Sequence, residues 1–141
     1  MSGSPKAGRV IPRLGKSVLN QACVLIAEDE PFIALDLALA IEDAGGRVLG
    51  PAASVKEALA LLETTDVAGA ILDVTLADED VTSIAERLIE RGVPLIVQTG
   101  VGLPAAMTAR FPHLPVRIKP CDSARLVDDL VALIGERPKA V

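Results

Sequence analysis

Acidic residues follow two apolar segments of this 141-residue chain, at points where a buried strand would end. Glu28 and Asp29 come directly after the apolar run 23–27, and Asp73 comes directly after the apolar run 68–72. Carboxylate oxygens are ligands that Mg²⁺ prefers, and neighbouring carboxylates repel one another unless a positive group offsets the repulsion or they point into water. These acids therefore predict a site for a hard divalent cation.

A hydroxyl group and an ammonium group stand at the ends of two further apolar segments. Thr99 ends the segment 93–99, and Lys119 ends the segment 116–119. An ammonium group can pair with a carboxylate or with a phosphoryl oxygen, and a hydroxyl group can donate a hydrogen bond to the same oxygen. Taken one at a time, such residues are often helix caps or turn residues. Their joint order at four strand ends favours phosphoryl transfer, in which catalysis is mostly positioning and charge neutralisation.

The elements that must position these groups alternate regularly between strands and helices. Helical patterns, one of them opened by the capping box Ser54–Glu57, lie between the apolar segments. Regular alternation predicts an α/β domain with a parallel sheet, right-handed crossovers and helices on both faces. Ligands bind beyond the carboxyl ends of such strands. The five predicted strands are 23–27, 47–52, 68–74, 93–99 and 116–119.

Charge and length divide the chain into three predicted parts. Residues 1–20 form a basic leader that we expect to be disordered, 21–135 form one domain, and 136–141 form a short tail. The leader has no aromatic residues beside its basic ones, so we expect no nucleic-acid partner. No apolar run has the length of a membrane span and no signal peptide opens the chain, which predicts a cytoplasmic protein without a membrane partner.

The few cysteine and histidine residues exclude several kinds of site. Cys23 and Cys121 are isolated in the sequence, and His113 is the single histidine, so a zinc site is not expected. A nucleophile activated by histidine would have to use His113, which lies in a proline-rich loop.

Four segments resemble, in order and spacing, the receiver domain of two-component response regulators: VLIAEDEP, AILDV, IVQTG and RIKP. The resemblance covers about residues 22–135. It implies a (βα)5 flavodoxin-like fold with five parallel strands. It also implies that the protein accepts a phosphoryl group from a histidine kinase or a histidine phosphotransfer protein.

The resemblance also implies a role for each matching residue. Asp73 matches the phosphoacceptor, Thr99 the switch hydroxyl and Lys119 the invariant lysine of the family. The bond between Lys119 and Pro120 matches a cis peptide bond. The residues implied to hold Mg²⁺ are Glu28, Asp29, Asp73 and the backbone carbonyl of Thr75.

Three departures from the family pattern concern the output and not the acceptor. Val116 stands where most receivers carry an aromatic residue in strand five, and Gly100 replaces a common Ala or Ser. The loop VTLADED replaces a turn that commonly contains Pro and Gly. The segment PLIVQTG and the missing aromatic residue resemble those of one subfamily, the single-domain regulators whose fourth strand reads Phe-Ala-Thr-Gly-Tyr. The chain would be a divergent relative of that subfamily.

Two other functions compete with that of a phosphoacceptor. A phosphatase of the haloacid dehalogenase type needs a second Asp two residues after its nucleophile, but Thr75 occupies that position. We therefore expect no enzyme, but an Mg²⁺-dependent acceptor that assists its own phosphorylation and dephosphorylation. The alternative is a receiver-like module that binds proteins without phosphorylation.

The predicted helix that begins at Pro31 is apolar on nearly all sides, apart from Asp36. A helix that covers a sheet needs only one apolar stripe. The apolar residues outside that stripe are predicted either to be buried on a second side of the helix or to form an exposed strip. An exposed strip would dock a kinase or phosphotransfer bundle, or a second copy of the chain as a homodimer. The downstream protein partner is left open.

Overall fold

The computed structural model describes residues 18–136, in which five strands and five helices alternate along the chain. This order confirms the predicted β-α alternation, and each strand lies within one of the predicted ranges. The strands are β1 (Cys23–Ala27), β2 (Arg47–Ala52), β3 (Gly69–Asp73), β4 (Leu95–Thr99) and β5 (Val116–Ile118). The helices are α1 (Pro31–Asp43), α2 (Val55–Thr64), α3 (Thr82–Glu90), α4 (Ala105–Arg110) and α5 (Ser123–Glu136).

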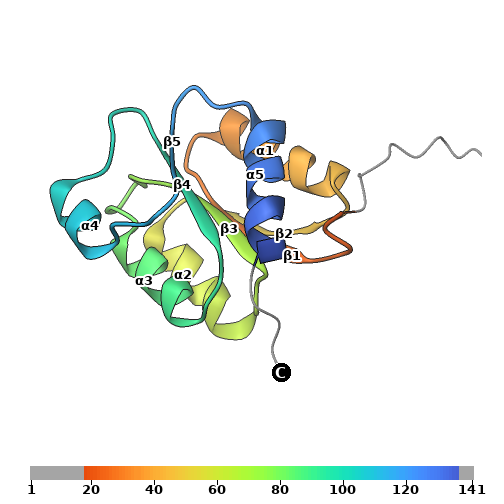
Figure 1. Cartoon of the computed structure of the whole chain (residues 1–141), viewed down its shortest axis with the longest axis horizontal. Helices are drawn as coiled ribbons and strands as arrows, with labels where there is room; N and C mark the ends of the chain where they lie inside the picture. Colours follow the sequence, from red (N-terminus) through yellow and green to blue (C-terminus); the bar gives the residue numbers. More distant parts are fainter. Residues whose placement is uncertain (1–17, 137–141) are drawn as a thin grey trace, which may run out of the picture.

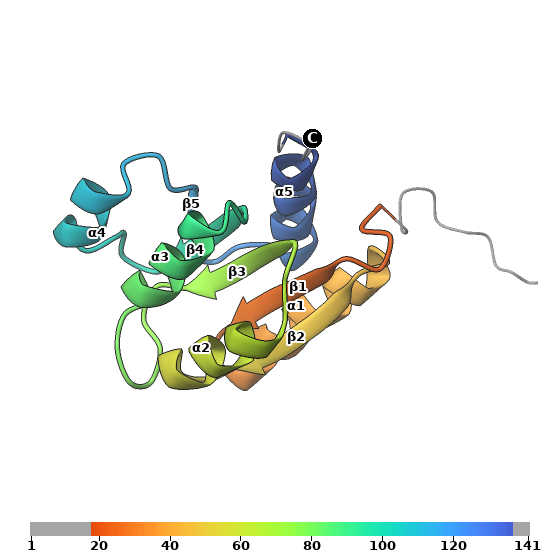
Figure 2. The same cartoon turned by 90° about the horizontal axis from the view of Figure 1, so that it is seen from below.

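The five strands form one parallel sheet in the order β2-β1-β3-β4-β5, as Figure 2 shows. The register places Ala27 beside Leu72, and Asp73 beside Gln98. The carboxyl ends of β1, β3 and β4 therefore meet at one edge of the sheet. This is the (βα)5 flavodoxin-like fold that the family resemblance implied.

Helices cover both faces of the sheet, with α1 and α5 on one face and α2 and α3 on the other (Figure 1). Alternate residues of each strand point to opposite faces. Val24 and Ile26 pack in the cluster under α1 and α5, whereas Leu25 packs in the cluster under α2 and α3. A strand buried on both sides has no polar face, which explains the continuous apolar runs in the sequence.

Local capping agrees with the predicted helix starts. The N–H of Glu57 donates to Oγ of Ser54 at 3.1 Å, and the Glu57 carboxylate accepts from the N–H of Ala53 at 3.0 Å. Glu30 is the N-cap of α1, because its Oε1 accepts from the N–H groups of Phe32 and Ile33. The bond between Lys119 and Pro120 is cis, as the family resemblance implied.

One side of α1 is exposed to solvent. Leu37 and Ile41 are fully buried against the sheet and α5, but Phe32 is 80% exposed, Leu35 is 55% exposed and Leu39 is 54% exposed. We call Phe32, Leu35 and Leu39 the α1 strip. Of the two readings of this helix, burial on two sides is wrong, and the exposed strip is correct.

The ends of the folded domain differ slightly from the predicted boundaries. Residues 1–17 of the predicted leader and 137–141 of the predicted tail lie outside the described residues. Leu19, which we placed in the leader, is 5% exposed, and its N–H donates to the carbonyl of Ala44 at 3.0 Å. At the other end, α5 includes Glu136. None of the described helices is long and apolar enough to cross a membrane.

Candidate functional site

Three carboxylates meet at the carboxyl edge of the sheet. Glu28 and Asp29 follow β1, Asp73 ends the neighbouring strand β3, and one oxygen from each lies within 4.8 Å of the others. Glu28 and Asp73 are buried, and Asp29 is exposed. Oxygen donors with this spacing fit a hard cation such as Mg²⁺, which keeps several water ligands on its open side.

Lys119 approaches the acids from the edge strand β5. Its Nζ lies 3.1 Å from Oδ2 of Asp73 and 3.7 Å from Oε1 of Glu28. Its backbone N–H donates to the carbonyl of Thr99 at 2.8 Å, which fixes the end of β5 against β4. Burial lowers the pKa of Lys119, but the hydrogen bond to Asp73 and the charge of Glu28 outweigh that effect, and the pKa lies above its ordinary value. Lys119 is therefore a fixed positive charge at this site.

Glu28 is the least accessible of the three acids, at 2% exposed. Its Oε2 accepts from the N–H of Glu30 at 3.1 Å. In the protein without metal, burial raises the pKa of Glu28 from 4.5 to about 7. The hydrogen bond from Glu30 lowers this pKa, and the negative charge of Asp73 raises it further. The negative charge of Asp73 therefore adds to the cost of burying Glu28 in its ionised form.

Gln98 is a site residue to which sequence reasoning gave no role. It is 2% exposed, it pairs with Asp73 across the sheet, and its Nε2 donates to Oε1 of Glu28 at 3.3 Å. The signal was a polar amide inside the apolar strand LIVQT, because a buried amide needs a partner. The identity of that partner could not be read from the chain, since Glu28 lies 70 residues away.

Thr99 is fully buried, but its hydroxyl group is turned toward the β4–α4 loop. Oγ1 donates to the carbonyl of Gly102 at 2.9 Å and accepts from the N–H groups of Val101 and Gly102. Within residues 18–136, this hydroxyl group makes no hydrogen bond to Asp73 or Lys119. The backbone of Thr99 thus contacts the site, through its carbonyl and the N–H of Lys119, whereas its side chain stabilises the turn that follows β4.

Thr75 lies two residues after Asp73 in an exposed part of the β3–α3 loop. The N–H of Val74 donates to the carbonyl of Gln98 at 2.9 Å, and Leu76 is 3% exposed, so the backbone is anchored on both sides of Thr75. No residue in the described range donates a hydrogen bond to the carbonyl of Thr75. That oxygen is free to serve as a ligand.

No protein-family model and no curated protein sequence matches the chain. Solved structures of receiver domains do match it. A CheY-like response regulator receiver domain protein from Methanospirillum hungatei JF-1 has a TM-score of 0.73 and 22% identity, covering 82% of this chain and 95% of that one. A response regulator receiver protein from Sinorhizobium medicae WSM419 has a TM-score of 0.73 and 25% identity, covering 85% and 99%.

Sequence identity is higher with SdrG from Sphingomonas melonis Fr1. The TM-score is 0.67 and the identity 34%, and the match covers 80% of this chain and 95% of that one. The parallel five-stranded sheet, with three acids and a lysine at its carboxyl edge, agrees with these matches. The chain belongs to the family of CheY-like response regulator receiver domains.

Proposed function

We propose that this receiver domain accepts a phosphoryl group on Asp73 from a histidine kinase or a histidine phosphotransfer protein. The observation that carries the proposal is the position of Asp73, whose Oδ2 lies 3.1 Å from Lys119 Nζ and which shares one 4.8 Å cluster with Glu28 and Asp29. A carboxylate with a fixed ammonium group and a cation site beside it suits phosphoryl transfer. The phosphorylated protein would then act in one of two ways. It would contact a downstream protein, or it would pass on or hydrolyse its phosphoryl group.

Mg²⁺ fits the oxygen donors at this edge of the sheet. The ligands would be the carboxylates of Asp29 and Asp73, the free carbonyl of Thr75, and Glu28 acting through a water molecule. Glu28 already accepts hydrogen bonds from Glu30 and Gln98, which supports the indirect role. When bound, Mg²⁺ neutralises negative charge on the carboxylates and on the incoming phosphoryl oxygens.

The transfer step is a displacement at phosphorus. A carboxylate oxygen of Asp73 attacks the phosphorus of a phosphohistidine, forming a P–O bond as the P–N bond breaks. The imidazole nitrogen of the donor keeps the electron pair and takes a proton from water. Lys119 supports this step because its ammonium group, already 3.1 Å from Asp73, can hold a phosphoryl oxygen. In this proposal the exchange takes place in the cytoplasm, where ATP is available to phosphorylate the donor histidine.

The new phosphoryl group adds negative charge beside Thr99. In our proposal, the Thr99 hydroxyl rotates toward this charge and gives up its hydrogen bond to the carbonyl of Gly102. The segment that follows is weakly held, because Val101 is 96% exposed and Met107 is the one buried residue of the short helix α4. Val116 has no aromatic side chain that could move together with the Thr99 hydroxyl. In our proposal, the conformational change after phosphorylation therefore depends on the backbone of the β4–α4 loop.

The donor protein docks on the α1 strip in this proposal. Phe32, from that strip, also lines a pocket of about 530 Å³ that reaches Lys119. An exposed apolar strip beside the acceptor suits a helical bundle that presents a phosphohistidine. A second copy of this chain is the other occupant that the strip could take. The other residues that line the pocket are Ile33, Asp36, Gln98, Lys119, Pro120, Cys121 and Ser123.

Intact mass spectrometry after incubation with Mg²⁺ and acetyl phosphate or phosphoramidate tests the acceptor. We expect one phosphoryl adduct on the wild type, none on Asp73→Asn, and an unchanged adduct on Asp66→Asn, which alters an exposed acid away from the site. In this proposal the chain is an acceptor and not an enzyme, and Asp73 is its single acceptor, so we expect no more than one adduct per chain. Absence of an adduct from every donor, including kinases, would overturn the proposal in favour of a phosphorylation-independent binding module.

A further inference from the structure

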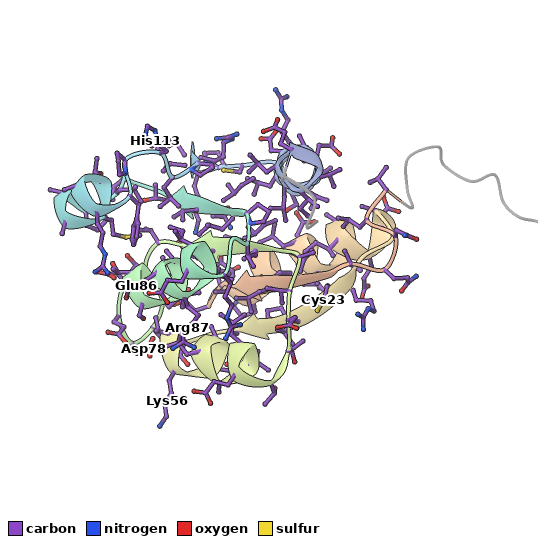
Figure 3. The ribbon with its side chains drawn as sticks, turned by 60° about the horizontal axis from the view of Figure 1, so that its bottom comes forward. Cys23, Lys56, Asp78, Glu86, Arg87 and His113 are labelled. Carbon is purple, nitrogen blue, oxygen red and sulfur yellow. The ribbon has the colours of Figure 1, made fainter. Side chains whose placement is uncertain are left out.

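Asp78 joins the loop after the phosphoacceptor to a different helix. It lies five residues after Asp73 in the sequence, and its carboxylate lies against the first turn of α2, near Lys56 (Figure 3). Oδ1 accepts from the N–H of Val55 at 2.8 Å, and Oδ2 accepts from the N–H of Lys56 at 3.3 Å. The first N–H groups of a helix have no partner within the helix, so this carboxylate supplies one from outside. The hydrogen bond from Val55 is the main reason that the pKa of Asp78 lies below its ordinary value.

The rest of the loop is closed on itself. The N–H of Leu76 donates to the carbonyl of Glu79 at 3.1 Å, and the N–H of Val81 donates to the carbonyl of Val74 at 3.1 Å. Asp80 accepts from the N–H of Thr82 at 2.9 Å and so serves α3. Among the described side-chain hydrogen bonds of this loop, those of Asp78 are the ones that reach α2.

The start of α2 is itself connected to the metal site. The N–H of Glu28 donates to the carbonyl of Ala52 at 2.9 Å, and Ala52 ends β2 three residues before α2 begins. The segment from Ala52 to Lys56 therefore contacts Glu28 at one end and Asp78 at the other. Through this segment, the loop that carries the carbonyl of Thr75 is tied to the residues around Glu28.

We propose that Asp78 is a positioning residue for the divalent cation, holding the Thr75 carbonyl in place by fastening the β3–α3 loop to α2. This inference rests on the proposed function, and it concerns the affinity for Mg²⁺ and not the transfer step. A loop that is already ordered loses less conformational entropy when the cation binds. Without the two hydrogen bonds, the loop keeps its internal hydrogen bonds but loses its attachment to α2. Cation binding must then restrict the movement of the whole loop, and the affinity for the cation falls.

The test compares Asp78→Ala with Glu79→Ala. Glu79 is the neighbouring acid, and its side chain makes no hydrogen bond or ion pair with the described residues, so the two variants lose the same charge at nearly the same place. Mg²⁺ affinity is measured by calorimetry, and phosphorylation by acetyl phosphate is followed as a function of Mg²⁺ concentration.

For Asp78→Ala we expect a dissociation constant and a half-saturating Mg²⁺ concentration about three- to tenfold higher than for the wild type. The rate at saturating Mg²⁺ should stay within about twofold of the wild type, because Asp73 and Lys119 are unchanged. Glu79→Ala should behave as the wild type. Asp78→Asn keeps one oxygen acceptor, so its dissociation constant for Mg²⁺ should lie between those of the wild type and Asp78→Ala. If Asp78→Ala does not fold, the measurement is made on Asp78→Asn.

Three results would overturn the inference. An Asp78→Ala protein with wild-type Mg²⁺ affinity would show that the hydrogen bonds do not position the ligand. Equal losses in Asp78→Ala and Glu79→Ala would assign the effect to charge alone. If Asp78→Ala is less stable but its Mg²⁺ titration is unchanged, Asp78 serves only to cap α2. Failure of the proposed function is distinguishable, since the wild type would then bind Mg²⁺ without forming any adduct.

Discussion

Each of the three consecutive acids after β1 has its own surroundings. Glu28 is buried and hydrogen-bonded, Asp29 is exposed at the cation site, and Glu30 caps α1 through its carboxylate. An acid at a helix N-terminus is favoured both by the free N–H groups and by the helix dipole. Only Glu28 and Asp29 therefore contribute to the crowding of charge around Asp73, and of these Glu28 bears the cost of burial.

Metal-free protein should lose stability as Glu28 ionises. The folded pKa of about 7 lies above the unfolded value of 4.5, so between these values the folded state holds a proton that the unfolded chain has released. The free energy of unfolding then falls as the pH rises through this window, by about 1 to 3 kcal/mol. Chemical denaturation in a chelating buffer, at pH values on both sides of the window, measures this fall.

Glu28→Gln removes the titrating group and keeps a side chain of the same size. We expect the variant to lose this decrease, because a neutral amide costs the same to bury at every pH. Glu57→Gln, at an exposed helix cap, is the matched control and should keep the wild-type dependence. An equal decrease in Glu28→Gln and in the wild type would assign the effect to another group.

At the scale of elements, α1 both covers the sheet and presents the α1 strip. We expect Leu35→Asp and Leu39→Asp to slow phosphotransfer from a kinase or phosphotransfer partner by about tenfold or more, as for residues at the centre of an interface. Both side chains are more than half exposed, so the free energy of unfolding should change little. Phosphorylation by acetyl phosphate should be unaffected, because that donor needs no docking.

Ile89→Asp provides the comparison for these variants. Ile89 is 43% exposed on α3, on the opposite face of the sheet, so its substitution should leave phosphotransfer unchanged. Global unfolding of Leu35→Asp would show that the strip is part of the core after all. Slow transfer in both Leu35→Asp and Ile89→Asp would point to a general effect of the added charge.

For the whole molecule, Mg²⁺ should act as a stabilising ligand of the fold. The three acids of the candidate site follow β1 and end β3, which are far apart in the sequence, so the unfolded chain does not bring them together. At a free concentration about a hundredfold above the dissociation constant, the expected gain in unfolding free energy is about 2.7 kcal/mol. Thermal denaturation with and without Mg²⁺ measures this gain.

Screening of charge by salt could imitate part of this effect. KCl at the same ionic strength separates the two, and it should give a much smaller gain than Mg²⁺. Asp29→Asn, which alters the exposed member of the acidic cluster without disturbing the core, should lose most of the Mg²⁺ gain. An equal gain from KCl and Mg²⁺ would contradict specific binding at this site.

The sequence alone was sufficient to predict a parallel α/β sheet and the acids at its carboxyl edge, for a physical reason. A strand buried on both faces must be apolar throughout, so any charged residue at its end is conspicuous, as Asp73 is after β3. In parallel strands all these ends lie at one edge. The residue types at these ends therefore predicted a shared site, and the structure places Glu28, Asp29, Asp73 and Lys119 together.

Only the tertiary structure decided which polar groups that are far apart in the sequence contact one another, and which apolar residues are exposed to solvent. Gln98 contacts Glu28 from 70 residues away, and Asp78 contacts the start of α2 from 22 to 23 residues away. Local periodicity carries no information about such pairs, since they depend on the register of strands and the path of loops. The exposure of the α1 strip likewise depended on what packs beside α1. The hydroxyl of Thr99 faces Gly102 because the loop closes there.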